Sequence, residues 1–470
     1  MSSFASLAIR PLLTGFVLAI ILSVAGCGSG NINTGVPPPP AVSNTQIRIG
    51  DAAVDEVIDF PVTIASPIKL QPSGTGAQIS VAVGPNHLEL SHMAAKLEAL
   101  AIANIPAGSY TSADITINTS AVTFVSPGGI PVVLFGPGAV TVTVPFSPAI
   151  TIGGTPSIIN IDFSLANSLL TSSTGAIVAI SFTPSSFTIS SSAVAAEASQ
   201  QDDTGEIEAL NGTISSVTGA SFGLNVGQSG AQLTLATDGT TQFTGGLTNL
   251  ASSVNQVVKI EGVTKSDGTL FAKEIEGVEA LAGSEINGTI IQLTPSISLS
   301  MVAQDGNGAG MDTTKVGASF TADLTALTAG KYLIDTHGMD LSGLAVPGPS
   351  FPFDAATIHA GQRVEVDSLG AIPAGGGVIT TDKVRLEQQA FNGTVANFVA
   401  GTGGNATFDL TLPLDSYLTT ITGQTVVHVF QQAGTDNRFG TISNTNFLRV
   451  RGLLFWTGTT FNLIARRITP

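Results

Sequence analysis

One short segment of this chain matches a hydrolase motif, but its surroundings do not. Residues 219–223, Gly-Ala-Ser-Phe-Gly, fit the Gly-x-Ser-x-Gly pattern. In hydrolases that pattern places the serine at a sharp turn between a strand and a helix. Here the segment lies between two alternating, strand-like runs, so we interpret it as a hairpin turn. A pair of carboxylates that meets only in space leaves no sequence pattern, so glycoside hydrolysis stays open as an alternative.

The histidines and acidic loops do not form a metal-binding motif. His87 and His92 are five residues apart, whereas two zinc ligands on one helix are four apart. Residues 305–312 have the aspartates and glycines of a calcium loop, but Val316 stands where an EF-hand needs glutamate. His428 alternates with valines, which favours a solvated or hydrogen-bonded strand residue. We therefore predict no catalytic residue, no metal ion and no cofactor.

Three residues near the C-terminus are the candidate ligand contacts. Trp456, the single tryptophan, is predicted at the turn of the last hairpin, where it would bind a sugar or plug a core. From residue 389 onward the chain has three acidic residues and five arginines, a net charge of +2. Arg449 and Arg451 alternate along one strand and share a face. They would meet an anionic glycan, a lipid headgroup or, as we favour, an acidic neighbour within the chain.

The single cysteine, Cys27, follows a segment with the features of a secretory signal. Arg10 precedes an apolar run of about 13 residues, Leu12 to Val24, which is short for a spanning helix of about 20 residues. Small residues then lead to the cysteine. The arrangement resembles the lipobox of bacterial lipoproteins. This resemblance implies that residues 1–26 are removed and that Cys27 carries acyl chains such as palmitate.

The same resemblance implies a location for the mature protein. Gly28, rather than aspartate, follows Cys27, which in Gram-negative bacteria favours the outer membrane without deciding its face. Residues 27–45 contain four consecutive prolines and are predicted to form a stiff tether. We expect the membrane as a partner through the N-terminal lipid, and an envelope protein or polysaccharide as a further partner. The net charge of −16 argues against nucleic acid.

Composition predicts an all-β protein with several domains. Charged residues make up only 11% of the 470 residues, and short alternating runs of Val, Ile, Thr and Phe are broken by turn residues. A chain of this length exceeds one core. We expect a β-sandwich over residues 46–192 with one short helix over 90–101, followed by a linker over 193–206.

The sandwich region has sequence landmarks in common with a known family. These landmarks are Gly-Asp-Ala at 50–52, Ile-Pro-Ala-Gly-Ser-Tyr-Thr at 105–111, and the segments 161–169 and 182–184. They resemble those of a bacterial lipoprotein family catalogued as domain of unknown function 4382. Ala53 stands where that family usually has proline. The resemblance implies a fold and an exported location, but no activity.

The rest of the chain is repetitive. An Asn-Gly-Thr opener recurs at Asn211, Asn287 and Asn392, and each is followed by a closing pair of strand-like runs. We expect three small β-barrels, OB-like by analogy, because closure hides strand edges. Their ranges are 207–280, 284–388 and 389–470. The middle copy is longest, and its Gly/Pro-rich stretch 338–356 is predicted to be a surface insertion.

The three copies resemble a second uncharacterised family, domain of unknown function 5666. The first copy keeps that family's closing Asp267-Gly268, whereas the third has Thr457-Gly458-Thr459 there. Taken together, the sequence predicts a non-enzymatic, lipid-anchored envelope protein that displays binding or structural modules. The alternative is a carbohydrate-active or other hydrolytic lipoprotein whose carboxylates assemble in space.

Overall fold

The computed structural model describes residues 42–470 apart from short gaps, and residues 41–470 form one compact unit. The gaps are 53–54, 84–86, 93–96, 127–129, 172–176, 195–205, 227–230, 266, 278–283, 308–314, 337–338, 340 and 342–350. The signal segment, Cys27, most of the tether and most of the predicted linker therefore lie outside the described residues. No helix in the described part of the chain is long and apolar enough to span a membrane.

The N-terminal region is a β-sandwich. The central strand of its first sheet is β1 (Val42–Ala52), which lies between β11 (Ser157–Ser164) and β6 (Leu97–Pro106). The strand β11 runs parallel to β1, and β6 runs antiparallel to it. The fourth strand, β14 (Phe187–Ala193), pairs with β11. The second sheet has the order β10 (Val140–Ile152), β7 (Gly108–Asn118), β3 (Pro61–Pro72) and β4 (Ile79–Val81), with β5 (His87–Glu89) also pairing with β3.

Alternating residues of both sheets fill the sandwich core, as period-two patterning requires. Ile47 and Ile49 on β1 are fully buried, and so are Ile115 and Ile117 on β7. Phe163 lies at the centre of a group of aromatic rings, 5.1 Å from Phe187 and 6.1 Å from Phe60 between ring centroids. The contact with Phe187 joins neighbouring strands of the first sheet, and the contact with Phe60 reaches the residue that directly precedes β3 of the second sheet.

Two smaller sheets flank this core. One has the order β2 (Val57–Asp59), β8 (Ala121–Ser126) and β9 (Ile130–Phe135), and the other pairs β12 (Leu169–Thr171) with β13 (Ile177–Ile180). The helix α1 (Leu165–Ser168) begins after Ser164, whose hydroxyl accepts a hydrogen bond of 3.3 Å from the Asn167 backbone N–H. This arrangement is a standard N-cap.

The helix predicted over residues 90–101 is wrong. A single 3-10 turn spans Leu90–His92, and the chain then enters strand β6 at Leu97. Ala99, Leu100 and Ala101 are all buried, so apolar residues at helical spacing also fit a strand that is buried on both faces. A short apolar run cannot distinguish the two. Pairing with β1 decides the outcome.

Three β-barrels follow the sandwich, and all have the same connectivity. We number the five strands of each barrel 1 to 5 in chain order. Strand 1 pairs with strands 2 and 4, strand 2 pairs with strand 3, and strand 4 pairs with strand 5. A parallel pairing of strands 3 and 5 closes the ring. The first barrel contains β15 (Glu206–Thr218), β16 (Ser221–Val226), β17 (Ala231–Ala236), β19 (Val257–Thr264) and β20 (Leu270–Gly277). The second contains β21 (Ser284–Thr294), β22 (Ser298–Asn307), β23 (Ser319–Asp323), β25 (Arg363–Ser368) and β26 (Gly377–Leu386). The third contains β27 (Gln388–Ala400), β28 (Ala406–Thr411), β29 (Val426–Asn437), β30 (Phe447–Trp456) and β31 (Phe461–Thr469).

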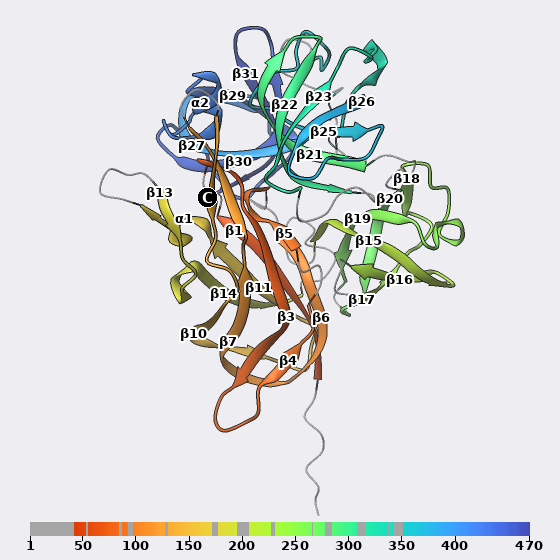
Figure 1. Cartoon of the computed structure of the whole chain (residues 1–470). Helices are drawn as coiled ribbons and strands as arrows, with labels where there is room; N and C mark the ends of the chain where they lie inside the picture. Colours follow the sequence, from red (N-terminus) through yellow and green to blue (C-terminus); the bar gives the residue numbers. More distant parts are fainter. Residues whose placement is uncertain are drawn as a thin grey trace, which may run out of the picture. The chain divides into compact units, whose positions relative to one another are not determined.

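Short elements complete the barrels. β18 (Gln242–Thr244) adds to β20 in the first barrel, and β24 (Tyr332–Ile334) adds to β26 at the same place in the second. The third has a helix, α2 (Tyr417–Thr422), between β28 and β29. Figure 1 shows the sandwich in orange to yellow and the barrels in green, teal and blue.

The glycine of each Asn-Gly-Thr opener has a steric role. A Cβ on Gly212, Gly288 or Gly393 would lie 2.7, 2.1 or 2.6 Å from a backbone oxygen of the neighbouring second strand. Contacts this short require a residue without a side chain. The repeat motif therefore marks a place where the backbone of strand 2 leaves no room for a side chain on strand 1. At residues 219–223, Gly219 (φ 62°) turns β15 into β16, so this segment is a hairpin turn, as predicted.

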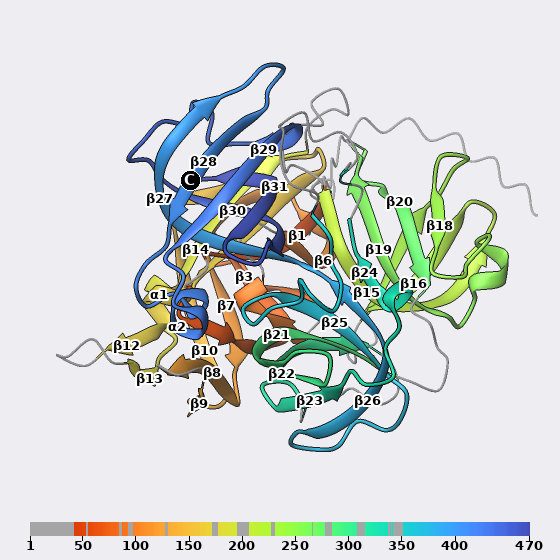
Figure 2. The same cartoon turned by 90° about the horizontal axis from the view of Figure 1, so that it is seen from above.

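The second and third barrels share an apolar interface. Leu453, Phe455 and Ile464, from β30 and β31, belong to the core cluster of the second barrel. Figure 2 shows these barrels, in teal and blue, side by side. The end of the predicted surface insertion lies in this interface, because Phe351 contacts Phe430 (5.3 Å) and Phe455 (5.4 Å). Phe351 is thus a packing residue of the interface, while Pro352 and Ala356 are exposed and most of the predicted insertion lies outside the described residues.

Candidate functional site

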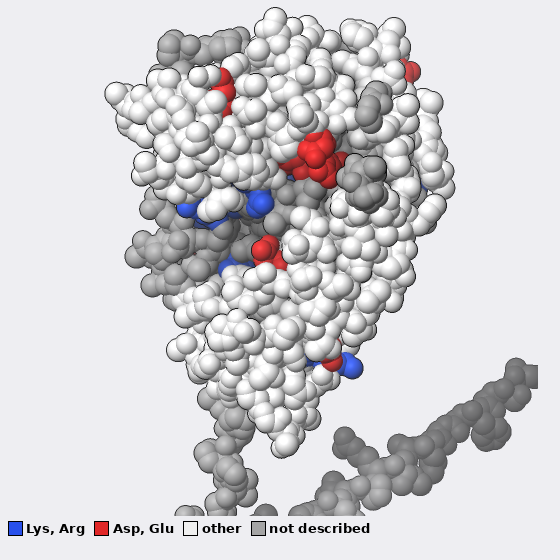
Figure 3. Space-filling view, turned by 90° about the vertical axis from the view of Figure 1, so that its left-hand side faces the viewer, with Lys and Arg blue, Asp and Glu red and all other residues white. Residues whose placement is uncertain are grey.

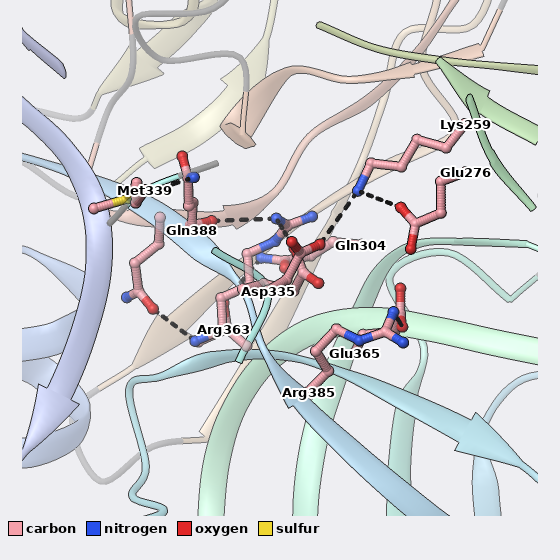
Figure 4. Close-up of polar contacts among 12 residues, drawn as sticks. Lys259, Glu276, Gln304, Asp335, Met339, Arg363, Glu365, Arg385 and Gln388 are labelled. Carbon is pink, nitrogen blue, oxygen red and sulfur yellow. Dashed lines mark hydrogen bonds and ion pairs between the residues drawn. The ribbon is translucent and has the colours of Figure 1, made fainter. Parts of the chain in front are cut away.

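A group of interacting charged side chains lies between the first and second barrels, and we call it the junction cluster. Lys259 on β19 extends toward the second barrel, where its Nζ lies 3.6 Å from Asp335 Oδ2. The same Nζ is 4.0 Å from Glu276 Oε2 of its own barrel. Figure 4 shows the lysine pointing toward both carboxylates. Lys259 therefore bridges two barrels.

The second barrel supplies the rest of the junction cluster. Arg385 on β26 pairs with Glu365 on the adjacent strand β25. Arg363 Nη1 lies 4.0 Å from Glu387 Oε2 and donates a hydrogen bond of 3.2 Å to the Gln388 carbonyl. Glu365, Glu387 and Arg363 are buried. Buried charges require partners, and these residues provide them for one another.

The electrostatics of the cluster follow from this crowding. Burial raises the pKa of Glu365 well above its usual range, and the nearby carboxylates Glu387 and Glu285 raise it further. Burial alone would lower the pKa of Lys259, but the surrounding carboxylates, Glu387 and Asp335 foremost, outweigh it and raise that pKa. Lys259 therefore stays charged and offsets several acids. These features are those of an ion-pair network between barrels.

Three acids of the second barrel have the spacing of a metal site. One carboxylate oxygen each from Glu285, Glu365 and Asp367 lie within 4.8 Å of one another. However, Lys383 Nζ is 2.7 Å from Asp367 Oδ2, and Arg385 contacts Glu365. Calcium needs six to eight oxygen ligands, and two of these three carboxylates already pair with cations. The residues fit ion pairing across strands better than a metal ion.

A second polar site joins the sandwich to the third barrel. Asp55 Oδ2 accepts a hydrogen bond of 2.9 Å from the Asn392 backbone N–H, and its Oδ1 accepts one of 3.1 Å from Asn392 Nδ2. Asn392 Oδ1 in turn accepts one of 3.0 Å from Arg449 Nε. Burial raises the pKa of Asp55 to about 7, although Asn392 and Arg449 oppose the shift.

Two pairs of carboxyl groups lie beside this site. Asp59 and Glu89 are buried and hydrogen-bonded to each other. Glu56 is hydrogen-bonded to Asp415, and partial burial together with that neighbour raises the pKa of Glu56 to about 7. Glycosidases keep their two carboxyl groups about 5 Å or more apart, whereas hydrogen-bonded oxygens are about 3 Å apart or less. Neither pair therefore has glycosidase geometry.

Burial raises the pKa of both members of the Asp59–Glu89 pair, but hydrogen-bond donors oppose the shift at Glu89. Glu89 Oε1 accepts hydrogen bonds from the Phe60 N–H (2.7 Å), the Ser91 N–H (3.0 Å) and the Ser91 hydroxyl (2.6 Å). These donors favour the ionised form of Glu89. Burial and the adjacent Glu89 raise the pKa of Asp59 well above its usual range. The pair thus favours a proton on Asp59 and a charge on Glu89, while Asp59 Oδ1 and Glu89 Oε2 have no hydrogen-bond partner among the described residues.

The structure places the sequence-predicted contact residues in separate surroundings. Arg449 is half-buried in the Asp55 network, and Arg451 is buried. Trp456 lies at the other end of β30, half-buried, with ring centroids 4.2 Å from His359 and 4.8 Å from Phe461. Cys27 lies outside the described residues. The tertiary structure therefore does not combine the three contact residues into one site.

Sequence reasoning missed a carboxylate–histidine pair on the third barrel. Asp409 on β28 and His428 on β29 face each other across the two strands, with a hydrogen bond between Oδ1 and Nδ1. Asp409 Oδ2 accepts a second hydrogen bond of 2.6 Å from Asn397 Nδ2. Such a pair orients an imidazole as in hydrolase triads. Both residues alternate with buried neighbours along their strands, but only the register of the two strands pairs them.

One part of the chain matches a known protein family. Residues 211–276 match the family model of a domain of unknown function, DUF5666. This match lies in the first barrel. None of the curated proteins matches the chain. A solved structure, Drosophila Unr CSD456, matches with 10% sequence identity over 57% of this chain and 97% of that chain. Its TM-score of 0.12 is too low to support an argument.

Proposed function

We propose that this protein is a non-enzymatic, lipid-anchored protein of a bacterial envelope, which presents its β-modules to an envelope protein or polysaccharide. One observation carries the non-enzymatic part. Many of the acidic and basic side chains in the described part of the chain are engaged in contacts between modules, as in the Lys259–Asp335 bridge and the Asp55–Asn392 network. Catalytic sites need such groups to be accessible to a substrate.

The anchor rests on the sequence around Cys27 and on the two lipoprotein-type resemblances. Acyl chains at Cys27 would hold the mature chain at a membrane, because each buried CH₂ contributes about 0.8 kcal/mol. Gly28 at the next position supports an outer-membrane location, by resemblance to lipoprotein sorting in Gram-negative bacteria. The tether and linker then serve as spacers around modules that pack into one unit.

Fatty-acid labelling and fractionation test the anchor. The wild-type chain should incorporate labelled palmitate and sediment with membranes, whereas Cys27→Ala should do neither. Cys27→Ser serves as a second variant, because it keeps the size and polarity of the side chain but offers no thiol. A wild-type chain that takes no label, together with a Cys27→Ala chain that remains membrane-bound, would refute the lipoprotein assignment.

In-cell cross-linking followed by mass spectrometry tests the display role. A stoichiometric envelope protein or polysaccharide is the expected product. The Asp409–His428 pair is the observation that favours the hydrolytic alternative. Hydrolysis of a glycan or ester that is lost in His428→Gln, with no stoichiometric partner found, would replace the display role by that alternative.

A further inference from the structure

The arginines of the third barrel gather at one end of it, and we call this region the arginine end. Strands β29, β31 and β30 lie side by side in this order. Their register brings the last residues of β29 and β31 beside the first residues of β30. The arginines on or directly after these segments are Arg438, Arg449, Arg451, Arg466 and Arg467. Strand pairing therefore concentrates the positive charge of this barrel in one place.

One acidic residue of the third barrel lies among these arginines. Asp436 Oδ2 is 2.5 Å from Arg438 Nη2 and accepts a hydrogen bond of 3.0 Å from Arg467 Nε. The other two acids of this barrel have partners of their own, in the pairs Asp409–His428 and Asp415–Glu56. The barrel thus places its arginines around a single carboxylate of its own, and positive charge is in excess there.

Two of the arginines face each other directly. Arg451 on β30 and Arg467 on β31 are register partners, and opposite side chains on neighbouring strands have Cβ atoms about 4.5–5.5 Å apart. Like charges in this position destabilise a sheet. Both residues are buried, at 9% and 3% exposure, so salt and water screen their repulsion less than at the surface. An anion bound beside them would offset this repulsion.

The arginine end is accessible to solvent at its rim. The side chains of Arg438 and Asp436 are 18% and 27% exposed, and Arg449 lies in the Asp55 network where the sandwich meets the barrel. The end of the chain, directly after β31, lies on the left in Figures 1 and 2, which is the side that Figure 3 presents. Figure 3 shows basic side chains along the rims of a hollow on that side. A small anionic group can therefore approach from solvent.

We propose that the arginine end binds a carboxylate or phosphate group of an acidic envelope polysaccharide. Guanidinium groups match the geometry of both anions with paired hydrogen bonds. A flexible glycan chain can insert a single anionic group into a recess. A bilayer or a nucleic acid would instead bring many negative charges against a protein with a net charge of −16. The proposal names a ligand class for the proposed display function and rests on that function.

Calorimetric titration of the lipidated protein in a neutral detergent tests this site. One probe is an oligosaccharide of galacturonic acid, which carries carboxylates, and a second is an oligosaccharide that carries phosphate monoesters. A neutral glucan of the same length is the control ligand. The wild-type protein should bind at least one acidic probe saturably and the neutral glucan not at all. The tighter of the two acidic probes identifies the anionic group.

Matched substitutions locate the site on the protein. Arg438→Gln removes one charge at the rim and should weaken binding at least about tenfold, because it removes charge-assisted hydrogen bonds. Arg466→Gln, at a half-buried position of the same end, is the second variant if the first does not fold. Lys331→Gln also removes one positive charge, but from an exposed pair with Asp382 on the second barrel. This control should change the affinity less than about twofold.

Two results would overturn the proposal. One is the absence of saturable binding to both acidic probes, and the other is an equal loss of affinity in Arg438→Gln and Lys331→Gln. In either case the arginines would be matched by acids within the chain. Binding to vesicles of phosphatidylglycerol, with no binding to either oligosaccharide, would overturn the polysaccharide assignment.

Failure of the display function would be recognised separately. In that case the purified protein would bind an acidic probe, but in-cell cross-linking would recover no polysaccharide. Conversely, a polysaccharide that still cross-links to the Arg438→Gln chain at the wild-type level would support the display function and overturn the arginine site.

Discussion

Asp55 of the sandwich accepts two hydrogen bonds from Asn392 of the third barrel, one from its backbone and one from its side chain. Asp55 precedes β2, whereas Asn392 belongs to the last Asn-Gly-Thr opener. Ile58 lies three residues after Asp55, and its carbonyl accepts a hydrogen bond from Gln304 of the second barrel. Residues 55–59 thus connect the sandwich to two barrels, so substitutions in this segment should change the stability of the protein.

Asp55→Asn should destabilise the junction with the third barrel. The amide of the new side chain cannot accept both hydrogen bonds, so one donor of Asn392 stays unsatisfied at a cost of about 1–3 kcal/mol. Urea unfolding measures the loss. Asp382→Asn is the control, because Asp382 forms an exposed pair with Lys331 and should change stability by less than about 0.5 kcal/mol. Equal losses in the two variants would contradict this account.

Stability should fall as the pH rises from about 4 to 8. The pKa of Asp55 is raised to about 7 and that of Asp59 is raised well above its usual range. The folded state therefore holds protons that the unfolded state has already released. The stability they contribute is complete below the unfolded pKa near 4 and is lost as the pH passes the folded pKa. Urea midpoints at several pH values measure the trend.

Asp59→Asn should make that profile flatter. The asparagine amide can donate to Glu89 at every pH, so it replaces the shared proton without titrating. Compared with the wild type, the variant should gain stability at pH 8 relative to pH 5. A slope unchanged by this substitution would show that the Asp59–Glu89 pair does not share a proton.

Lys259→Met should weaken the association of the first two barrels. Methionine preserves the apolar stem but leaves Asp335 and the neighbouring buried carboxylates without their shared cation, at a cost of about 3 kcal/mol. A double-mutant cycle with Asp335→Asn measures the coupling, and the second change should restore part of the loss. Additive effects of the two substitutions would argue against a direct bridge.

Gly317→Ala should disrupt the contact between the second barrel and the sandwich. Gly317 has φ of 77°, and a Cβ there would lie 2.6 Å from Asp59 Oδ2. Left-handed backbone strain adds about 1–2 kcal/mol for alanine, so the total loss should exceed about 2 kcal/mol. Gly330→Ala is the control, because its Cβ would meet no atom within 4 Å. Thermal melting compares them.

Trp456→Ala separates packing from ligand binding. The indole is half-buried against His359 and Phe461, so truncation should cost about 2–4 kcal/mol, whereas Trp456→Phe should keep most of the stability. Denaturant unfolding followed by circular dichroism checks both. A stable Trp456→Ala chain that loses binding to an envelope partner would instead make Trp456 a contact residue.

Much of the architecture follows from local patterns in the sequence. Alternation predicted the strands that contain Ile47, Ile115 and Ile161, because one face of each is apolar. The three Asn-Gly-Thr openers predicted three similar barrels, and the steric need for glycine at 212, 288 and 393 explains why the motif recurs. Glycines at 219 and 268 marked hairpins because their positive φ values suit tight turns.

Long-range pairing decided what local patterns could not. Residues 97–101 belong to the run with helical spacing but lie in β6, because β1 offers a partner with a buried face. Val57 and Ile58 are neighbours in the chain, yet alternation places one in the sandwich core and the other in the core of the third barrel. The polar sites are also products of assembly. Lys259 and Asp335, like Asp55 and Asn392, are far apart in sequence, and only the packing of modules determines which charges meet.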